Sequence, residues 1–247
     1  MGPVTAHFLG SGDAFGSGGR FQTCIAIRTS DDLFLVDCGA SSLIAMRQQG
    51  VAPRDVSKIL ITHLHGDHFG GLPFFLLDAQ LVSKREAPLT IAGPPGLRER
   101  LHSTMEDLFP GSSGVKPSFE LRLLELQPRA PTSVEQIVVT AFPAAHFSGA
   151  PSYSLRVNVE DKVFVYSGDT QWTDNLVEAS ADADLFVCEC YVFDQQVPLH
   201  NNYRTVEKNQ ARLTCKRLVL THLSDDMLSR VDQIDLPTAR DGLELAL

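Results

Sequence analysis

The stretch that decides the fold of this chain is Ile59-Leu60-Ile61-Thr62-His63-Leu64-His65-Gly66-Asp67-His68-Phe69-Gly70-Gly71. A short apolar run ends, and three histidines and one aspartate follow within six positions. Imidazole nitrogens and carboxylate oxygens are the usual ligands of zinc-type divalent metals, and the end of a strand supports them rigidly. Because side chains two positions apart on extended backbone point the same way, His63 and His65 are expected to face one side. Asp67 and His68 then lie where the chain turns, so the stretch predicts a metal site.

Glycines accompany these four polar residues. Gly66, Gly70 and Gly71 are expected to permit a tight turn and a close backbone approach. The alternative interpretation is a surface loop that happens to be rich in histidine. We favour the metal site, because burying four such groups at a strand end without a metal would leave costly unpaired polar atoms.

Three more candidate ligands occur later in the chain, each directly after an apolar run that reads as a strand. They are His146, Asp169 and His222. Taken alone, each has an ordinary structural explanation. Taken with the first stretch, they extend the predicted metal site across the chain.

The apolar runs elsewhere are short, and glycine and proline separate them. Period-two patterns and β-branched residues predict strands at 5–9, 23–28, 33–36, 58–62, 89–92, 119–124, 137–142, 154–159, 162–166, 185–189, 217–221 and 243–247. Helices are expected at 41–49, 72–82, 96–108, 173–179 and 203–213. Early strands follow one another and later strands alternate with helices, which predicts an α+β fold with two packed sheets and helices outside.

Composition limits the classes of protein to consider. The chain has 247 residues and a formal net charge of −9, so nucleic acid and anionic membranes are poor default partners. No apolar run approaches the roughly 18 residues of a membrane-spanning helix, and we expect no membrane association. The five cysteines form an odd number and no secretory signal is visible, so reduced thiols and a cytoplasmic protein are expected.

The segment Thr62–His68 resembles the H-x-H-x-D-H signature of the metallo-β-lactamase superfamily. The resemblance covers nearly the whole chain and implies an αββα sandwich, a single domain over residues 1–247, and hydrolysis of esters, lactones, thioesters or phosphodiesters. It implies two divalent metal ions, with zinc expected and manganese or iron as alternatives. One metal would be held by His63, His65 and His146. The other would be held by Asp67, His68 and His222, with Asp169 bridging both and Asp67 also able to accept a proton.

The segments around these ligands favour one branch of the superfamily. Similarity to ribonuclease Z and its phosphodiesterase relatives is carried by residues 8–15, 36–39, 167–170 and 221–224. Ribonuclease Z has a His-Glu-Ala-Thr motif where this chain has Cys188-Glu189-Cys190-Tyr191, so the motif's histidine is absent and Glu189 is retained. Whether Cys188 or Glu189 takes over its role stays open. A second family histidine matches His200, which becomes the candidate general acid or phosphate contact.

The tRNA-binding arm of ribonuclease Z is missing. His146 and Asp169 are only 23 positions apart, which leaves room for one hairpin. No Lys/Arg cluster replaces the arm, so tRNA is not the expected partner. The pattern resembles phosphodiesterases that act on small anionic substrates such as cyclic nucleotides or cyclic sugar phosphates, and homodimers are common among them. Three alternatives remain: an ester, lactone or thioester hydrolase on the same metals, a tRNA 3′-processing endonuclease, and a non-catalytic metal-binding regulatory protein.

Overall fold

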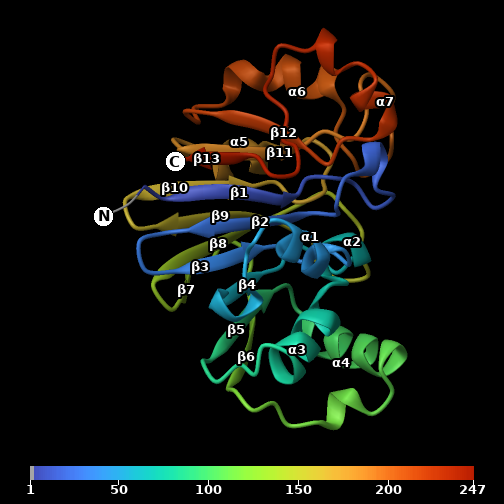
Figure 1. The fold of residues 1–247 in the computed structure, drawn as a ribbon. Coiled ribbons are helices and arrows are strands. Elements are labelled where there is room, and N and C mark those ends of the chain that lie inside the picture. The colour runs from blue at the N-terminus through green and yellow to red at the C-terminus, as the bar shows by residue number, and fades with distance from the viewer. Residues whose placement is uncertain (1–2) are drawn as a thin grey trace.

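A computed structural model describes residues 3–247 of the chain. Over that range, two mixed sheets pack face to face, and helices cover the outer face of each sheet (Figure 1). This is the αββα sandwich, and the predicted fold class is confirmed.

The first sheet has seven strands among the described residues, in the order β13-β1-β2-β3-β4-β5-β6. Their bounds are β1 Thr5–Gly10, β2 Cys24–Arg28, β3 Leu33–Val36, β4 Lys58–Leu60, β5 Leu89–Gly93, β6 Leu121–Glu125 and β13 Glu244–Ala246. Pairing is antiparallel from β13 to β3 and parallel from β3 to β6. Parallel strands need crossover connections, and the helices after β3, β4 and β5 provide them.

The second sheet, within the same described range, has six strands in the order β12-β11-β10-β9-β8-β7. Their bounds are β7 Thr132–Val134, β8 Ile137–Pro143, β9 Tyr153–Val159, β10 Lys162–Tyr166, β11 Leu185–Glu189 and β12 Leu218–Thr221. Strands β7 to β10 form an antiparallel meander, and β10, β11 and β12 are parallel. Between His146 and Asp169 the chain therefore forms only the β9–β10 hairpin and loops.

The α-helices are α1 Ser42–Gln48, α2 Gly66–Phe69, α3 Leu72–Leu81, α4 Leu97–Leu108, α5 Asp174–Ala179, α6 Tyr203–Asn209 and α7 Asp225–Leu228. Short 3-10 turns lie at 17–19, 53–55, 112–114, 210–212 and 231–233. Helices α1, α3 and α4 pack on the first sheet, and α5, α6 and α7 pack on the second. In the part of the chain that the structure describes, no helix combines the length and the apolar character that a membrane crossing requires.

The strands bury both faces, and alternate residues serve different layers. In β3, Phe34 and Val36 point into the core between the sheets, whereas Leu33 and Leu35 pack under the outer helices. In β10, Phe164 belongs to the core between the sheets, and Val165 faces the helices on the other side. This period of two explains why the runs read as continuously apolar.

Most predicted elements are present, with shifted ends. The expected 203–213 helix ends at Asn209 and continues as a 3-10 turn over 210–212, and β6 starts two residues later than expected. Strand β7 was not predicted, because three residues after Pro131 carry too little pattern. Helix α1 ends at a glycine, since Gly50 follows the C-cap residue Gln49 and has φ 70°.

The topology sets the place of the site. Parallel strands β3 and β4 of one sheet and β10 to β12 of the other end at the same edge of the sandwich. The residues at or just after these ends are Asp37, His63, Asp169, Glu189 and His222. Ligand sites of sheets with parallel strands form beyond the carboxyl ends of those strands, and the polar residues of this chain gather there.

Candidate metal centre

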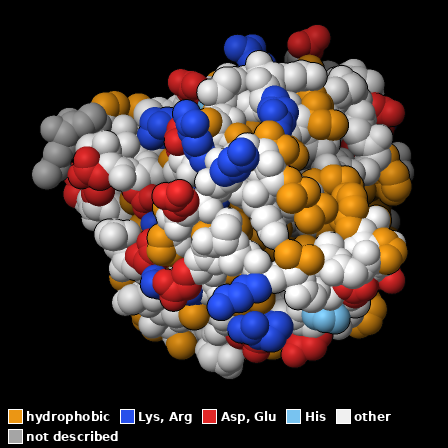
Figure 2. All heavy atoms as spheres, turned by 60° about the horizontal axis from the view of Figure 1, so that its bottom comes forward, with side chains coloured by type: hydrophobic (Ala, Val, Ile, Leu, Met, Phe, Trp, Pro, Cys, Tyr) orange, Lys and Arg blue, Asp and Glu red, His pale blue; other side chains and the backbone are white. Residues whose placement is uncertain are grey.

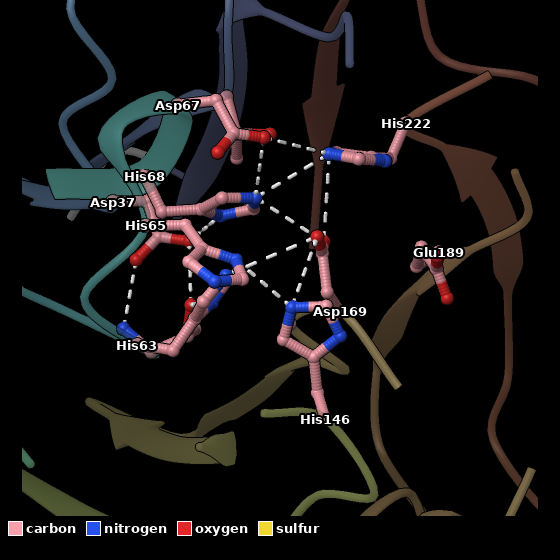
Figure 3. Close-up of polar contacts among 12 residues, drawn as sticks. Asp37, His63, His65, Asp67, His68, His146, Asp169, Glu189 and His222 are labelled. Atoms are coloured by element: carbon pink, nitrogen blue, oxygen red, sulfur yellow. Dashed lines mark hydrogen bonds and ion pairs between the residues drawn. The ribbon is translucent and has the colours of Figure 1, made fainter. Parts of the chain in front are cut away.

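The structure brings together all seven residues that the sequence nominated as metal ligands (Figure 3). They fall into two groups whose ligand atoms lie within 4.8 Å of one another, namely His63, His65 and His146, and Asp67, His68, Asp169 and His222. These groups match the two sets that the resemblance implies. Their action as metal ligands stays a prediction.

Asp169 lies between the two groups, as Figure 3 shows. Its Oδ2 atom is 3.9 Å from Nε2 of both His63 and His146. Its Oδ1 atom is 3.2 Å from Nε2 of His68 and 3.5 Å from Nε2 of His222. One carboxylate thus presents one oxygen to each group, which is the arrangement that a bridging ligand requires.

The nitrogen and oxygen atoms that converge here would be better satisfied by a bound cation than by contact with one another. His146 Nε2 faces His65 Nδ1 at 3.0 Å, and His68 Nε2 faces His222 Nε2 at 3.4 Å. His63 Nε2 and Asp169 Oδ1 are buried without a hydrogen-bond partner among the described residues. Buried lone pairs that converge without protons are costly, and divalent metals bound between them would remove that cost.

Asp37 orients two of the histidines. Its Oδ2 atom accepts hydrogen bonds from His68 Nδ1 at 2.6 Å and from the Thr62 hydroxyl at 2.8 Å, and the Thr62 amide donates to Oδ1 at 2.8 Å. The same hydroxyl oxygen accepts from His63 Nδ1 at 3.1 Å. With both Nδ1 atoms donating, the Nε2 lone pairs of His63 and His68 are left for a metal.

His146 has a corresponding backbone partner. Its Nδ1 atom donates to the Leu199 carbonyl at 3.0 Å, which again leaves Nε2 free. Leu199 has φ 69°, a left-handed conformation that is unusual for leucine. The loop that carries His200 therefore also fixes the orientation of a candidate metal ligand.

Two of the polar residues at the site have strained backbone. Asp37 has φ 59° and His222 has φ 60°, in the left-handed region that non-glycine residues avoid. Each such residue costs about 1–3 kcal/mol, and the surrounding structure has to enforce it. Gly168, just before Asp169, has φ 58°, and a Cβ atom there would lie 2.7 Å from the Tyr153 carbonyl oxygen.

Electrostatics set the protonation of these side chains: two carboxylates and His63 are in the form that binds metals, whereas nearby carboxylates raise the pKa of His68 and His222. Burial acts to raise the pKa of Asp67 and of Asp169, but neighbouring histidines outweigh it and lower both pKa values, so both carboxylates stay charged. Burial lowers the pKa of His63, which keeps that imidazole neutral. The two carboxylates outweigh burial at His222 and raise its pKa to about 9, so a bound cation would displace a proton there.

His200 lies beside the two groups and is held by Glu189. Its Nδ1 atom donates to Glu189 Oε1 at 2.5 Å, and the other Glu189 oxygen accepts from the Asn201 amide at 3.0 Å. Glu189 is fully buried, and its carboxylate outweighs burial to raise the pKa of His200. The buried Cys188 thiol lies 3.4 Å from the Glu189 carbonyl oxygen, whereas the Glu189 side chain contacts His200, so Glu189 is the residue that reaches the site region.

A cavity of about 350 Å³ opens onto these residues. Its polar lining residues are His65, Asp67, His146, Asp169, His200 and His222. The other lining residues are Ala14, Phe15, Tyr191, Val197 and Pro198. Ligand pockets in proteins span about 300–1,000 Å³, so this one suits a small molecule.

Sequence reasoning missed Asp37 and the Leu199 carbonyl. Asp37 stands directly after the apolar run 33–36, as the recognised ligands stand after theirs, and that position was the available signal. The Leu199 contact depends on a carbonyl oxygen in a left-handed turn, and no residue type indicates it.

The fold and the two ligand groups define a metallohydrolase with the metallo-β-lactamase fold, similar to ribonuclease Z. The ribonuclease Z of Methanothermobacter thermautotrophicus is 27% identical, over 88% of this chain and 85% of its own length. The crystal structure of human tRNase Z, short form (ELAC1), superposes with a TM-score of 0.79 and 29% identity over 98% of both chains. The metallo-β-lactamase fold protein YhfI from Bacillus subtilis superposes with a TM-score of 0.77 and 19% identity, over 99% of both chains.

A family model places the chain more narrowly. The model described as anti-Pycsar protein Apyc1 matches residues 4–236, so the chain belongs to that family. The family degrades cyclic nucleotides, and the chain is a metallohydrolase of the phosphodiesterase class, as the sequence predicted.

Proposed function

We propose that this protein hydrolyses a cyclic nucleotide at two divalent metal ions, and that zinc is the resident metal. The observation that carries the proposal is the division of seven ligands into two groups that share Asp169, with His200 at their border. Nitrogen and oxygen ligands of this kind suit zinc, with manganese and iron as alternatives.

The ligand assignment follows the observed groups. His63, His65 and His146 would hold one metal, and Asp67, His68 and His222 would hold the other, with Asp169 common to both. When bound, the metals supply positive charge that neutralises the phosphate and lowers the pKa of a nearby water.

The side chains of this chain supply proton transfer and orientation. Asp67 is charged and lines the cavity, so it can accept a proton from the water that attacks phosphorus. Attack breaks the bond between phosphorus and one ribose oxygen, and that oxygen needs a proton. With Nδ1 fixed on Glu189, His200 can deliver the proton from Nε2 and take one back from solvent.

A substrate screen with metal analysis tests this function. The purified protein, with its metal content measured, is assayed on 3′,5′-cyclic nucleotides and bis(p-nitrophenyl) phosphate and on lactone and thioester panels. We expect hydrolysis of the phosphodiesters and about two metals per chain. Activity confined to lactones or thioesters would favour the alternative hydrolase. Absence of bound metal, together with a stability that chelators do not change, would favour a non-catalytic protein.

The role of His200 has its own test. We expect His200→Ala to lower turnover of cyclic nucleotides about 10²–10⁴-fold, the usual contribution of a general acid, with metal content unchanged. His102→Ala is the matched control. This histidine lies in helix α4, and among the residues that the structure describes its side chain forms a hydrogen bond only with Ser113. Unchanged turnover of His200→Ala would remove the residue from the mechanism.

A homodimer stays a prediction of the resemblance. Figure 2 turns forward the end of the molecule that carries α3 and α4, and apolar side chains gather on that face. The exposed apolar residues of α3, α4 and their flanking segments are Phe74, Leu81, Val82, Leu108 and Val115. An exposed apolar patch of this kind suits contact with a second copy, and sedimentation of Leu81→Asp against the unmodified protein checks it.

A further inference from the structure

The cavity at the metal centre is also lined by side chains that proton transfer and metal binding do not use. They are Phe15, Tyr191, Val197 and Pro198, together with Ala14. Phosphate chemistry needs none of these side chains, so they are available to another part of the substrate.

The role of His200 places the ribose beside Tyr191. His200 has to lie next to the leaving ribose oxygen to protonate it, and the Tyr191 ring centroid is 4.9 Å from that of His200. Val197 and Pro198 precede His200 in the same loop. A base attached to the ribose can therefore extend along Tyr191 toward Phe15, which lines the same cavity.

Phe15 lies at the mouth of the cavity, in a loop whose backbone is hydrogen-bonded to the Asp13 carboxylate. Its side chain is 83% exposed, although the cavity is directly beside it. The buried Asp13 carboxylate accepts hydrogen bonds from the amides of Phe15 at 3.2 Å and Ser17 at 2.9 Å. The Ser17 hydroxyl donates to the same carboxylate at 2.7 Å. The loop backbone that carries this exposed aromatic ring is thus fixed beside the cavity.

We propose that Phe15 and Tyr191 are the walls of a nucleobase subsite, with Phe15 stacking on the base as a specificity-determining residue. The inference rests on the proposed function. Every nucleobase has a π-face, and stacking on an aromatic side chain stabilises it without hydrogen bonds. Phe15 would then favour cyclic nucleotides over cyclic sugar phosphates that lack a base.

A second groove offers the competing location. It is about 580 Å³ in volume, shares Ala14 and Asp67 with the first cavity, and is lined by Phe74, Thr104 and Leu108 among others. His200 and Tyr191 line the first cavity and not this groove, so a base placed in the groove would lie away from both. We therefore assign the base to the Phe15 side, and Phe74 gives a direct test of that choice.

The experiment compares two substrates on the metal-loaded protein, 3′,5′-cyclic AMP and 1-deoxyribose 3′,5′-cyclic phosphate, which has no base. We expect Phe15→Ala to lower kcat/KM for cyclic AMP about tenfold, mainly through KM, because one stacked base contributes about 5- to 150-fold. The base-free substrate should be cleaved at an unchanged rate, and Phe15→Trp should retain the activity on cyclic AMP. Binding of the slowly hydrolysed phosphorothioate analogue of cyclic AMP should weaken by the same factor in Phe15→Ala.

Phe147→Ala is the matched control, since Phe147 is 74% exposed but does not line the cavity. Three results would each overturn the subsite. Phe15→Ala could lose kcat/KM equally on both substrates, or lose none, or the loss for cyclic AMP could occur in Phe74→Ala instead. If the unmodified, metal-loaded protein cleaves neither substrate, the proposed function itself fails. Cleavage of cyclic AMP that is insensitive to Phe15 refutes the subsite alone.

Discussion

At the scale of single residues, Asp37 orients candidate metal ligands without lining the cavity itself. It is fully buried and fixes His68 directly and His63 through Thr62. In Asp37→Asn, an amide hydrogen would meet the Nδ1 hydrogen of His68. We expect metal affinity to fall about 10–100-fold, as is usual when the partner of a ligating histidine is lost.

Metal titration followed by calorimetry measures this change. Asp78→Asn is the control, because Asp78 is also a buried carboxylate and pairs with Arg47 and Ser83 instead of the cluster. That variant should lose stability and keep its metal affinity. Equal metal affinities in Asp37→Asn and the unmodified protein would mean that Asp37 does not orient His68.

Glu189 gives a prediction about pH. The carboxylate outweighs burial to raise the pKa of His200, and the protonated imidazole is the active acid. Activity should therefore fall as pH rises through this pKa. In Glu189→Gln the pKa of His200 drops, so the falling limb of the kcat profile moves to lower pH. Glu178→Gln, which alters an exposed carboxylate paired with Arg129, should leave the limb in place. If the falling limb of Glu189→Gln coincides with that of the unmodified protein, Glu189 does not set the pKa of the catalytic acid.

Site residues that stand together in one short sequence motif could be predicted, and contacts between distant segments could not. His63, His65, Asp67 and His68 stand in one short motif, and chemistry alone nominates them. The sequence left open whether Cys188 or Glu189 takes over the role of the missing histidine, and the hydrogen bond from His200 to Glu189 is visible only in three dimensions.

At the scale of elements, the turn from β4 into α2 and α3 depends on two of its three glycines. A Cβ atom on Gly71 would lie 2.3 Å from the Gly39 carbonyl oxygen and 2.8 Å from that of Cys38, and a Cβ atom on Gly70 would lie 2.5 Å from the Gly66 carbonyl oxygen. A Cβ atom on Gly66 would meet nothing within 4 Å. The expected close approach is therefore confirmed for Gly70 and Gly71 and was wrong for Gly66.

We expect Gly71→Ala to destabilise the protein by about 1–3 kcal/mol, because the added methyl group forces backbone apart in a packed region. Gly66→Ala should change the free energy of unfolding by less than about 0.5 kcal/mol. Urea denaturation of the two variants beside the unmodified protein measures both. Equal stabilities would show that the loop can move away from the end of β3.

Elements with a strong period were predictable, and their ends were not. The buried strands β3, β10 and β11 match their expected bounds, because alternate residues pack into two different apolar layers. The end of α6 depends on where Gln210 and the residues after it tighten into a 3-10 turn, which local sequence does not encode.

At the scale of the whole molecule, the ribonuclease Z relatives and the acidic charge point to different substrates. The net charge is −9, and the segment between His146 and Asp169 is occupied by a hairpin. A tRNA ligand would need several phosphate contacts, and the expected signature of such contacts is a steep loss of affinity with salt. We expect no salt-sensitive tRNA binding between about 50 and 200 mM salt, measured by fluorescence anisotropy. Precursor tRNA should stay uncleaved under conditions where cyclic nucleotides are hydrolysed, with a ribonuclease Z as the positive control. Because the same metals would serve both reactions, cleavage of tRNA at a comparable rate would show that charge and the missing arm do not decide the substrate of this fold.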